Sequence, residues 1–134
     1  MKSILLVDDD QWVRTLYGLV LRRNGYHVIE ADSGAAALEM ARKYLPDLIL
    51  CDIIIPGSDG VSLLRQIRRD PNLENRQFVL MSGSPDVSTS YKGIEEADDF
   101  LVKPISLREL LNCVKARFLG SRPRNRSTIL EEKR

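Results

Sequence analysis

The chain has only two cysteines, and it lacks any long hydrophobic run. Cys51 and Cys113 both stand inside apolar segments, which is typical of reduced thiols in a protein core and argues against a disulfide framework or a thiolate metal site. No segment approaches the roughly 20 consecutive apolar residues of a membrane-spanning helix. The N-terminal segment leads directly into a run of aspartates, unlike a secretory signal. We therefore expect a cytoplasmic protein without a membrane partner.

The chain also lacks an excess of charge of either sign. Lys and Arg number 20 and Asp and Glu number 19, which gives a formal net charge of +1, so a broad nucleic-acid surface on this chain alone is not expected. Neither a Gly-x-Gly-x-x-Gly pattern nor a P-loop is present, which leaves nucleotide binding without support. A length of 134 residues, 43% of them hydrophobic, suits one globular domain with its own core.

What is present is a short apolar segment followed by a helix-forming one, repeated along the whole chain. The expected strands are Ile4–Val7, His27–Ala31, Asp47–Ile53, Phe78–Met81 and Phe100–Val102. Nearly every residue of the third segment is apolar, as in a strand covered on both faces. These units predict an α/β fold, a (βα)5 doubly wound five-stranded parallel sheet with right-handed crossovers.

The helix boundaries carry signals of their own. The clearest are the caps Asp10 and Asp59, the stops Asn24-Gly25 and Pro46, and the capping box Ser106-x-x-Glu109. Only a weak helix is expected between Asp86 and Ala97. From residue 120 to residue 134, arginines alternate with Pro, Asn and Ser, which predicts a disordered tail or linker after a domain of residues 1–119.

The polar residues that follow the expected strands form the candidate site, because the carboxyl ends of parallel strands meet at one edge, where ligands bind. These residues are Asp8 and Asp9 after the first strand, Asp52 at the end of the third, Ser82 after the fourth and Lys103 after the fifth. Converging carboxylates repel one another unless a cation neutralises them, and oxygen ligands suit Mg²⁺ or Mn²⁺. Lys103 and Ser82 add a positive charge and a hydroxyl for phosphoryl oxygens. Together these groups indicate phosphoryl transfer to an aspartate.

Four segments resemble the signature motifs of the response-regulator receiver family. They are Leu5–Asp10, Asp52–Gly60, Met81–Gly83 and Phe100–Pro104, in the family's order and spacing, within a resemblance that covers about residues 2–119. The resemblance implies a flavodoxin-like strand order of 2-1-3-4-5. It also implies a signalling switch rather than an enzyme, one that catalyses only its own phosphorylation and dephosphorylation.

The resemblance further implies a role for several residues by position. Asp52 is implied to be the phospho-acceptor. Asp52 and Asp9 are implied to bind Mg²⁺ or Mn²⁺ directly, with the backbone carbonyl of Ile54 as a further ligand. Asp8 is implied to bind the ion mainly through water.

A second set of implied roles concerns the switch. Ser82 is implied to be the switch hydroxyl, Lys103 the clamp on the phosphoryl group, and Phe100 the aromatic side chain that follows the switch. The peptide bond before Pro104 is implied to be cis. The departures from the family pattern are mild: Ile54 and its neighbour replace the methionines common in this turn, and the segment from Ser82 to Phe100 is about one residue short.

The implied phosphodonor is a histidine kinase or a phosphotransfer protein. The implied readers are an output domain, a protein partner or a second copy at the face of the fourth helix, fifth strand and fifth helix. Two alternatives stay open: a receiver-like binding module that never takes phosphate, and a phosphohydrolase of the haloacid dehalogenase type, whose Asp-x-Asp motif fits Asp8–Asp10. The second alternative leaves Asp52 unexplained. Taken singly, Asp8 and Asp9 also suit helix caps, and Phe100 also suits plain core.

Overall fold

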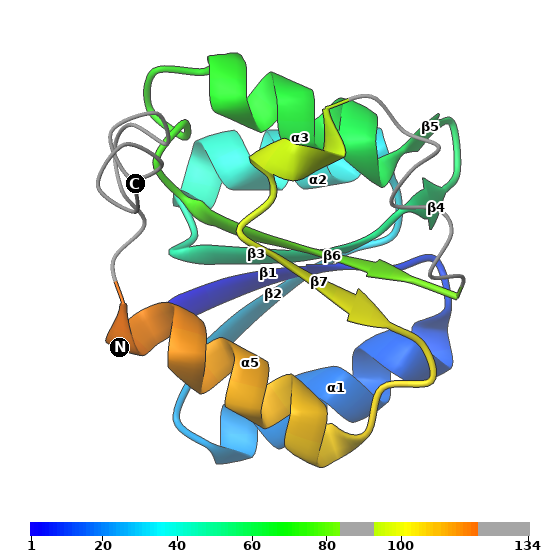
Figure 1. The fold of residues 1–134 in the computed structure, drawn as a ribbon, viewed down its shortest axis with the longest axis vertical. Helices are drawn as coiled ribbons and strands as arrows, with labels where there is room; N and C mark the ends of the chain where they lie inside the picture. The colour runs from blue at the N-terminus through cyan, green and yellow to red at the C-terminus, as the bar shows by residue number, and fades with distance from the viewer. Residues whose placement is uncertain (84–92, 121–134) are drawn as a thin grey trace, which may run out of the picture.

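The computed structural model describes residues 1–83 and 93–120, and these form a parallel sheet between two layers of helices (Figure 1). The strands of the described sheet are β1 (Ser3–Val7), β2 (His27–Ala31), β3 (Leu48–Asp52), β6 (Gln77–Ser82) and β7 (Asp99–Val102). Their order is β2-β1-β3-β6-β7, and every pairing is parallel. Since β6 and β7 are the fourth and fifth of the predicted strands, the expected order 2-1-3-4-5 is confirmed.

The helices cover both faces of the sheet. In Figure 1, α2 (Gly34–Tyr44) and α3 (Gly60–Arg69) lie above the sheet, and α1 (Gln11–Arg23) and α5 (Leu107–Leu119) lie below it. Side chains alternate along a strand, so each strand serves two cores. In β1, Leu5 and Val7 belong to the cluster under α2 and α3, and Ile4 and Leu6 belong to the cluster under α1 and α5.

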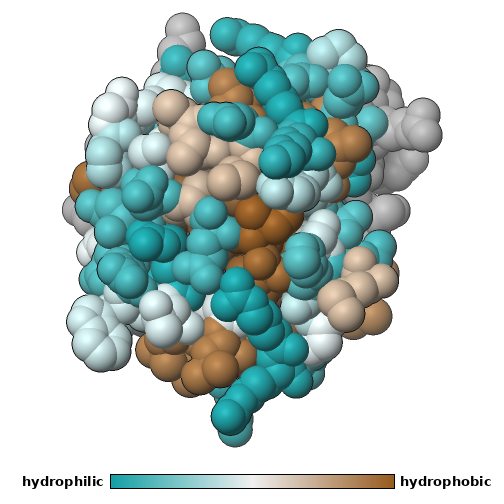
Figure 2. Space-filling model, turned by 180° about the vertical axis from the view of Figure 1, so that it is seen from behind, coloured by the Kyte–Doolittle hydropathy of each residue, from teal (hydrophilic) through white to brown (hydrophobic). Residues whose placement is uncertain are grey.

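Strand β2 forms one edge of the sheet, and charged side chains cover it. Arg22 donates to the backbone carbonyl of Val28 at 3.1 Å and forms an ion pair with Glu30 at 3.1 Å. Glu30 also pairs with Arg14 at 3.5 Å. Charges of this kind discourage a second chain from pairing with an exposed strand. Figure 2 shows this side of the molecule, with apolar side chains at its centre and hydrophilic ones around them.

The predicted helix signals work as expected. The side chain of Asp10 accepts hydrogen bonds from the backbone N–H groups of Trp12 and Val13, and Asp59 caps α3 through Ser62. The N–H of Glu109 donates to the hydroxyl of Ser106, and the reciprocal bond of the capping box is present at the start of α5. The sequence therefore predicted these three helix starts correctly.

Three features differ from the prediction or lie outside it. The predicted turn after β3 carries a small antiparallel pair, β4 (Ile54–Ile55) and β5 (Ser58–Asp59). The described part of the predicted weak helix, from Gly93 to Ala97, holds only a 3-10 turn, Ile94–Glu96, and the rest of that prediction lies outside the described residues. Residues 121–134 of the predicted tail also lie outside them. None of the described helices is long and apolar enough to cross a bilayer.

Gly60 brings the start of α3 against the end of β3. Its N–H donates to the carbonyl of Ile53 at 2.6 Å. A Cβ at this position would lie 2.5 Å from the backbone oxygen of Asp52 and 3.0 Å from the Cα of Ile53. Both are backbone atoms, so neither can rotate away. A residue without a Cβ is therefore required next to Asp52.

We expect Gly60→Ala to lower the free energy of unfolding by about 1–3 kcal/mol, because the added methyl group must displace the end of β3. Urea unfolding measures this change. Gly83→Ala is the matched control, since no atom of the described residues lies within 4 Å of the Cβ that it would add. Equal stability of Gly60→Ala and the wild type would contradict the close approach.

Candidate functional site

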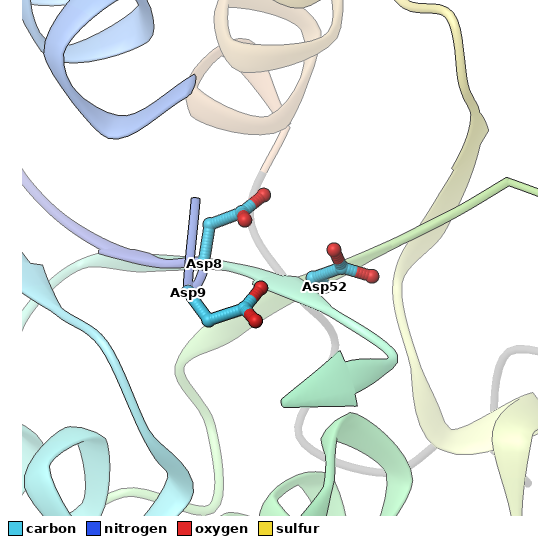
Figure 3. Close-up of side chains that lie close together, drawn as sticks. All are labelled: Asp8, Asp9 and Asp52. Carbon is cyan, nitrogen blue, oxygen red and sulfur yellow. The ribbon is translucent and has the colours of Figure 1, made fainter. Parts of the chain in front are cut away.

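The carboxyl edge of the sheet brings together the polar residues predicted for the site. β1 ends at Val7, directly before Asp8, and β3 ends at Asp52 itself. Figure 3 shows the carboxyl groups of Asp8, Asp9 and Asp52 close together where these two strands end. One carboxylate oxygen from each lies within 4.8 Å of the others. Such a group of oxygens can hold a hard divalent cation.

Lys103 is the cation that contacts the carboxylates of Asp8 and Asp52. Its Nζ donates to Oδ2 of Asp52 at 2.8 Å and to Oδ2 of Asp8 at 3.0 Å. Its backbone N–H donates to the carbonyl of Ser82 at 2.6 Å, and the peptide bond between Lys103 and Pro104 is cis. The lysine therefore bridges two carboxylates, and the ends of β1, β3 and β6 are joined through it.

Asp8 and Asp9 are adjacent in sequence but differ in environment. Asp8 is fully buried, and its Oδ1 accepts the N–H of Asp10 at 2.9 Å while its Oδ2 accepts from Lys103. Asp9 is exposed. Both oxygens of Asp8 are thus already hydrogen-bonded, whereas the carboxylate of Asp9 faces solvent at the mouth of the site.

Burial and charge shift the pKa values here in predictable directions. Desolvation by burial raises the pKa of Asp8 above its ordinary value of 3.8, against the lowering effect of its hydrogen bonds with Asp10 and Lys103. For Lys103, burial lowers the pKa, but the hydrogen bonds and charges of Asp52 and Asp8 outweigh it and raise the pKa above its ordinary value. Lys103 is therefore charged at neutral pH, and the three carboxylates still outnumber it.

Of the remaining predicted residues, Ser82 and Ile54 lie at this edge, and Phe100 lies two residues before the end of β7. Ser82 ends β6 and is buried, opposite Val102 of β7. Phe100 stands in β7 opposite Leu80 and is half-buried against the cluster under α2 and α3. Ile54 is 72% exposed, and its backbone N–H donates to Oδ1 of Asp52 at 3.2 Å.

Arg14 is a residue of this edge that the sequence did not single out. Its guanidinium donates to the backbone carbonyl of Asp8 and pairs with Glu30 of β2. It therefore holds the turn between β1 and α1 in place. Because this contact is with a backbone carbonyl, no side-chain pattern in the sequence signalled it.

The two cysteines behave as core residues. Both are free and buried among the described residues. Burial raises the pKa of Cys51 well above its ordinary value, and burial together with the charge of Asp99 raises that of Cys113 to about 12. Neither thiol is poised to act as a nucleophile at neutral pH.

The raised pKa of Asp8 means that its ionised form costs stability. The folded state holds the proton more tightly than the unfolded state, so this contribution to the free energy of unfolding falls as the pH rises from 3.8 through the folded pKa. We expect Asp8→Asn to be more stable than the wild type at neutral pH and to lose that advantage as the pH falls toward 3.8. Urea unfolding over a pH series measures this difference, with Glu39→Gln as an exposed control. An advantage that persists at low pH would contradict the assignment.

Comparison with known proteins agrees with this geometry. Residues 4–115 match the family model described as the response regulator receiver domain. The transcriptional regulatory protein AfsQ1 of Streptomyces coelicolor is 40% identical over 111 residues, which are 82% of this chain and 48% of that protein. The chain therefore spans about half the length of this curated relative.

Solved structures share the fold. The chemotaxis response regulator CheY4 of Vibrio cholerae has a TM-score of 0.80 at 27% identity, covering 87% of this chain and 98% of that one. The response regulator TrrA of Thermotoga maritima, solved in complex with Mg²⁺-BeF, has a TM-score of 0.78 at 30% identity, with the same coverage of 87% and 98%. Because the family model matches residues 4–115, which are most of this chain, the chain belongs to the response regulator receiver family.

Proposed function

We propose that Asp52 accepts a phosphoryl group from the phosphohistidine of a histidine kinase or of a phosphotransfer protein. The observation that carries this proposal is the contact of Lys103 Nζ with Oδ2 of Asp52 at 2.8 Å, beside the exposed carboxylate of Asp9. It joins a nucleophile, a fixed positive charge and an open acidic group at one sheet edge.

We include Mg²⁺, or Mn²⁺ in its place, as the cofactor. Asp9, Asp52 and the backbone carbonyl of Ile54 would hold it directly, and Asp8 would act through water. Three carboxylates within reach of one ion support this assignment, because they exceed the single charge of Lys103. The bound ion would neutralise charge on the phosphoryl oxygens. Its presence in the TrrA complex of Thermotoga maritima is in keeping with the proposal.

In the proposed transfer, an oxygen of the Asp52 carboxylate forms the new P–O bond. The P–N bond to the donor imidazole breaks, and the imidazole nitrogen takes the electron pair and then a proton. The N–H of Ile54 holds Oδ1 of Asp52 and so orients the carboxylate. Lys103 moves its hydrogen bond from Asp52 to a phosphoryl oxygen, which costs little because its Nζ already lies at the carboxylate.

We assign the response of the fold to Ser82 and Phe100. The hydroxyl of Ser82 binds a phosphoryl oxygen and draws the end of β6 toward Asp52, which biases an equilibrium between two states. Phe100 is only half-buried, so its ring has room to follow. Hydrolysis of the phosphoaspartate then resets the switch slowly.

An output partner belongs to the same proposal. The curated relative AfsQ1 is a transcriptional regulatory protein about twice the length matched here. We propose that residues 1–119 are the receiver and residues 120–134 a tail or linker, and that an output domain, a separate protein or a second copy reads the face that includes β7 and α5. A cytoplasmic location remains a prediction of the sequence.

The two alternative functions gain no support from the site. A phosphohydrolase of the haloacid dehalogenase type is not favoured by the match to the receiver family. A receiver-like module that never takes phosphate usually lacks an acid, hydroxyl or lysine position, and Asp52, Ser82 and Lys103 are all present.

We expect the chain to gain one labile phosphoryl mass when it is incubated with Mg²⁺ and acetyl phosphate or phosphoramidate. Asp52→Ala should abolish the gain, because the nucleophile is removed, and Asp32→Ala, which removes an exposed aspartate, should keep it. Intact mass spectrometry reads the adduct. Folded, Mg²⁺-binding protein that takes no phosphoryl group from either donor would favour the unphosphorylated binding module.

We expect a long-lived phosphoaspartate, because the apolar side chain of Ile54 stands exposed beside Asp52 and offers nothing to orient an attacking water. Ile54→Asn should release phosphate several-fold faster, because an amide can hydrogen-bond that water. Ile54→Val keeps the apolar character and should leave the rate unchanged. Phosphate release after removal of the donor measures both rates, and equal rates in Ile54→Asn and the wild type would refute this reason.

A further inference from the structure

The side chain of Arg14 joins the acidic edge of the sheet to the outer strand β2. Its guanidinium donates to the backbone carbonyl of Asp8, and its Nε lies 3.5 Å from Oε1 of Glu30. Only 14% of the side chain is exposed, so both contacts are largely shielded from water and are stronger for it. Arg14 therefore connects three elements, because it belongs to α1, Asp8 follows β1 and Glu30 belongs to β2.

Glu30, the acidic partner of Arg14, is itself held in place. Nη2 of Arg22 lies 3.1 Å from its Oε2 and donates to the carbonyl of Val28 at 3.1 Å. Gly18 leaves the space for this pair, because a Cβ there would lie 3.0 Å from Nη1 of Arg22 and 3.5 Å from Oε2 of Glu30. The carboxylate that orients Arg14 is thus bound on the far side by a second residue of α1.

The contact with Arg14 fixes the peptide unit between Asp8 and Asp9. The atoms of a peptide unit lie in one plane, and this unit includes the Cα of Asp9. On its other side, the backbone N–H of Asp8 donates to the carbonyl of Ala31 at 3.2 Å. The backbone of Asp8 is therefore hydrogen-bonded on both sides, which sets the position of the Cα of Asp9.

The carboxylate of Asp9 depends on that backbone for its placement. Within residues 1–83 and 93–120, it makes no hydrogen bond or ion pair with a side chain. Figure 3 shows it pointing toward Asp52 from the turn that follows β1. A bound ion would have only to select a side-chain rotamer of Asp9, because the peptide before it is already held.

We propose that Arg14 is a positioning residue of the ion site and that it makes the site prefer Mg²⁺ to Ca²⁺. Mg²⁺ requires nearly ideal octahedral geometry, whereas Ca²⁺ accepts displaced ligands and variable coordination. A fixed peptide between Asp8 and Asp9 therefore benefits Mg²⁺ more. Groups behind the direct ligands tune metal affinity by orienting those ligands. The inference rests on the proposed function, because it concerns the ion that Asp9 and Asp52 would hold.

NMR titration of the full, unphosphorylated ¹⁵N-labelled chain with Mg²⁺ and, separately, with Ca²⁺ measures this preference. Arg14→Met removes the donors and the charge at similar side-chain length. We expect the Kd for Mg²⁺ to rise about tenfold, the loss typical when a group that orients a metal ligand is removed. The Kd for Ca²⁺ should rise about threefold or less, because Ca²⁺ tolerates a displaced ligand. Lower stability alone would not change the ratio of the two Kd values, since both describe the folded protein.

Two further variants separate geometry from charge. Arg14→Lys keeps the charge but loses the planar fork, and it should reduce the preference for Mg²⁺ in the same direction. Arg22→Met removes the other cation paired with Glu30, whose contacts are with Glu30 and Val28, and it should leave both Kd values unchanged. A purely electrostatic role predicts another pattern. Arg14→Met would then bind both ions more tightly, because a nearby cation is removed, and Arg14→Lys would match the wild type.

An unchanged ratio of the two Kd values in Arg14→Met and Arg14→Lys would overturn the proposal, as would an equal change in Arg22→Met. Urea unfolding shows whether Arg14→Met remains folded. Arg14→Lys, which keeps the charge opposite Glu30, decides the comparison where Arg14→Met does not fold.

Phosphoryl uptake by the wild type separates this inference from the proposed function. If the wild type takes a phosphoryl group from acetyl phosphate while both Arg14 variants keep the wild-type ratio, the inference fails alone. If the variants lose the preference for Mg²⁺ but the wild type takes no phosphoryl group, the transfer to Asp52 fails and the role of Arg14 stands. A folded wild type that binds neither ion overturns both.

Discussion

The ammonium group of Lys103 compensates two carboxylates that a covered parallel sheet leaves at its edge. Helices cover both faces of the sheet, and these two carboxylates stand at the edge where β1 and β3 end. Asp8 is fully buried there and Asp52 nearly so, and two such anions would repel each other strongly without the bridging lysine. The backbone N–H of Lys103 also donates to the carbonyl of Ser82 at the end of β6. The three strand ends are thereby held in one place, ready for chemistry.

Most of the fold could be predicted because burial leaves a clear mark on sequence. Strands covered on both faces are apolar throughout, and each of the predicted strands matches an observed one within two residues at either end. Side-chain caps depend only on nearby residues, so the caps Asp10, Asp59 and Ser106 could be predicted from the sequence. The pair β4 and β5 could not be predicted, because strands of two residues have no periodicity and this pair forms around the positive φ of Gly57.

The sequence predicted which residues form the site but not their burial or their contacts with one another. Convergence of Asp8, Asp9, Asp52 and Lys103 follows from topology, since parallel strands end at one edge. Topology does not determine whether Asp8 or Asp9 is buried, because the two residues are chemically identical neighbours and only the packing distinguishes them. The resemblance to receivers gave them different roles; the distances now show the two oxygens of Asp8 engaged and Asp9 open to solvent. Arg14 escaped notice because its contact with the carbonyl of Asp8 depends on a backbone turn, which no side-chain pattern announces.

The alternation of β1 between two cores constrains the length of the chain as well as its composition. Leu5 and Val7 face one layer of helices, and Ile4 and Leu6 face the other. Each of these residues could be replaced by another apolar residue of similar size. Removal of a single residue between Ser3 and Val7 is a different event. It would turn every later side chain of the strand to the opposite face, or shift the aspartates that follow by one place along the edge. Strand β1 can therefore accept apolar substitutions, but it cannot accept the insertion or deletion of one residue without misplacing side chains. The number of residues between the start of β1 and Asp8 is thus more tightly constrained than the identity of the residues within it.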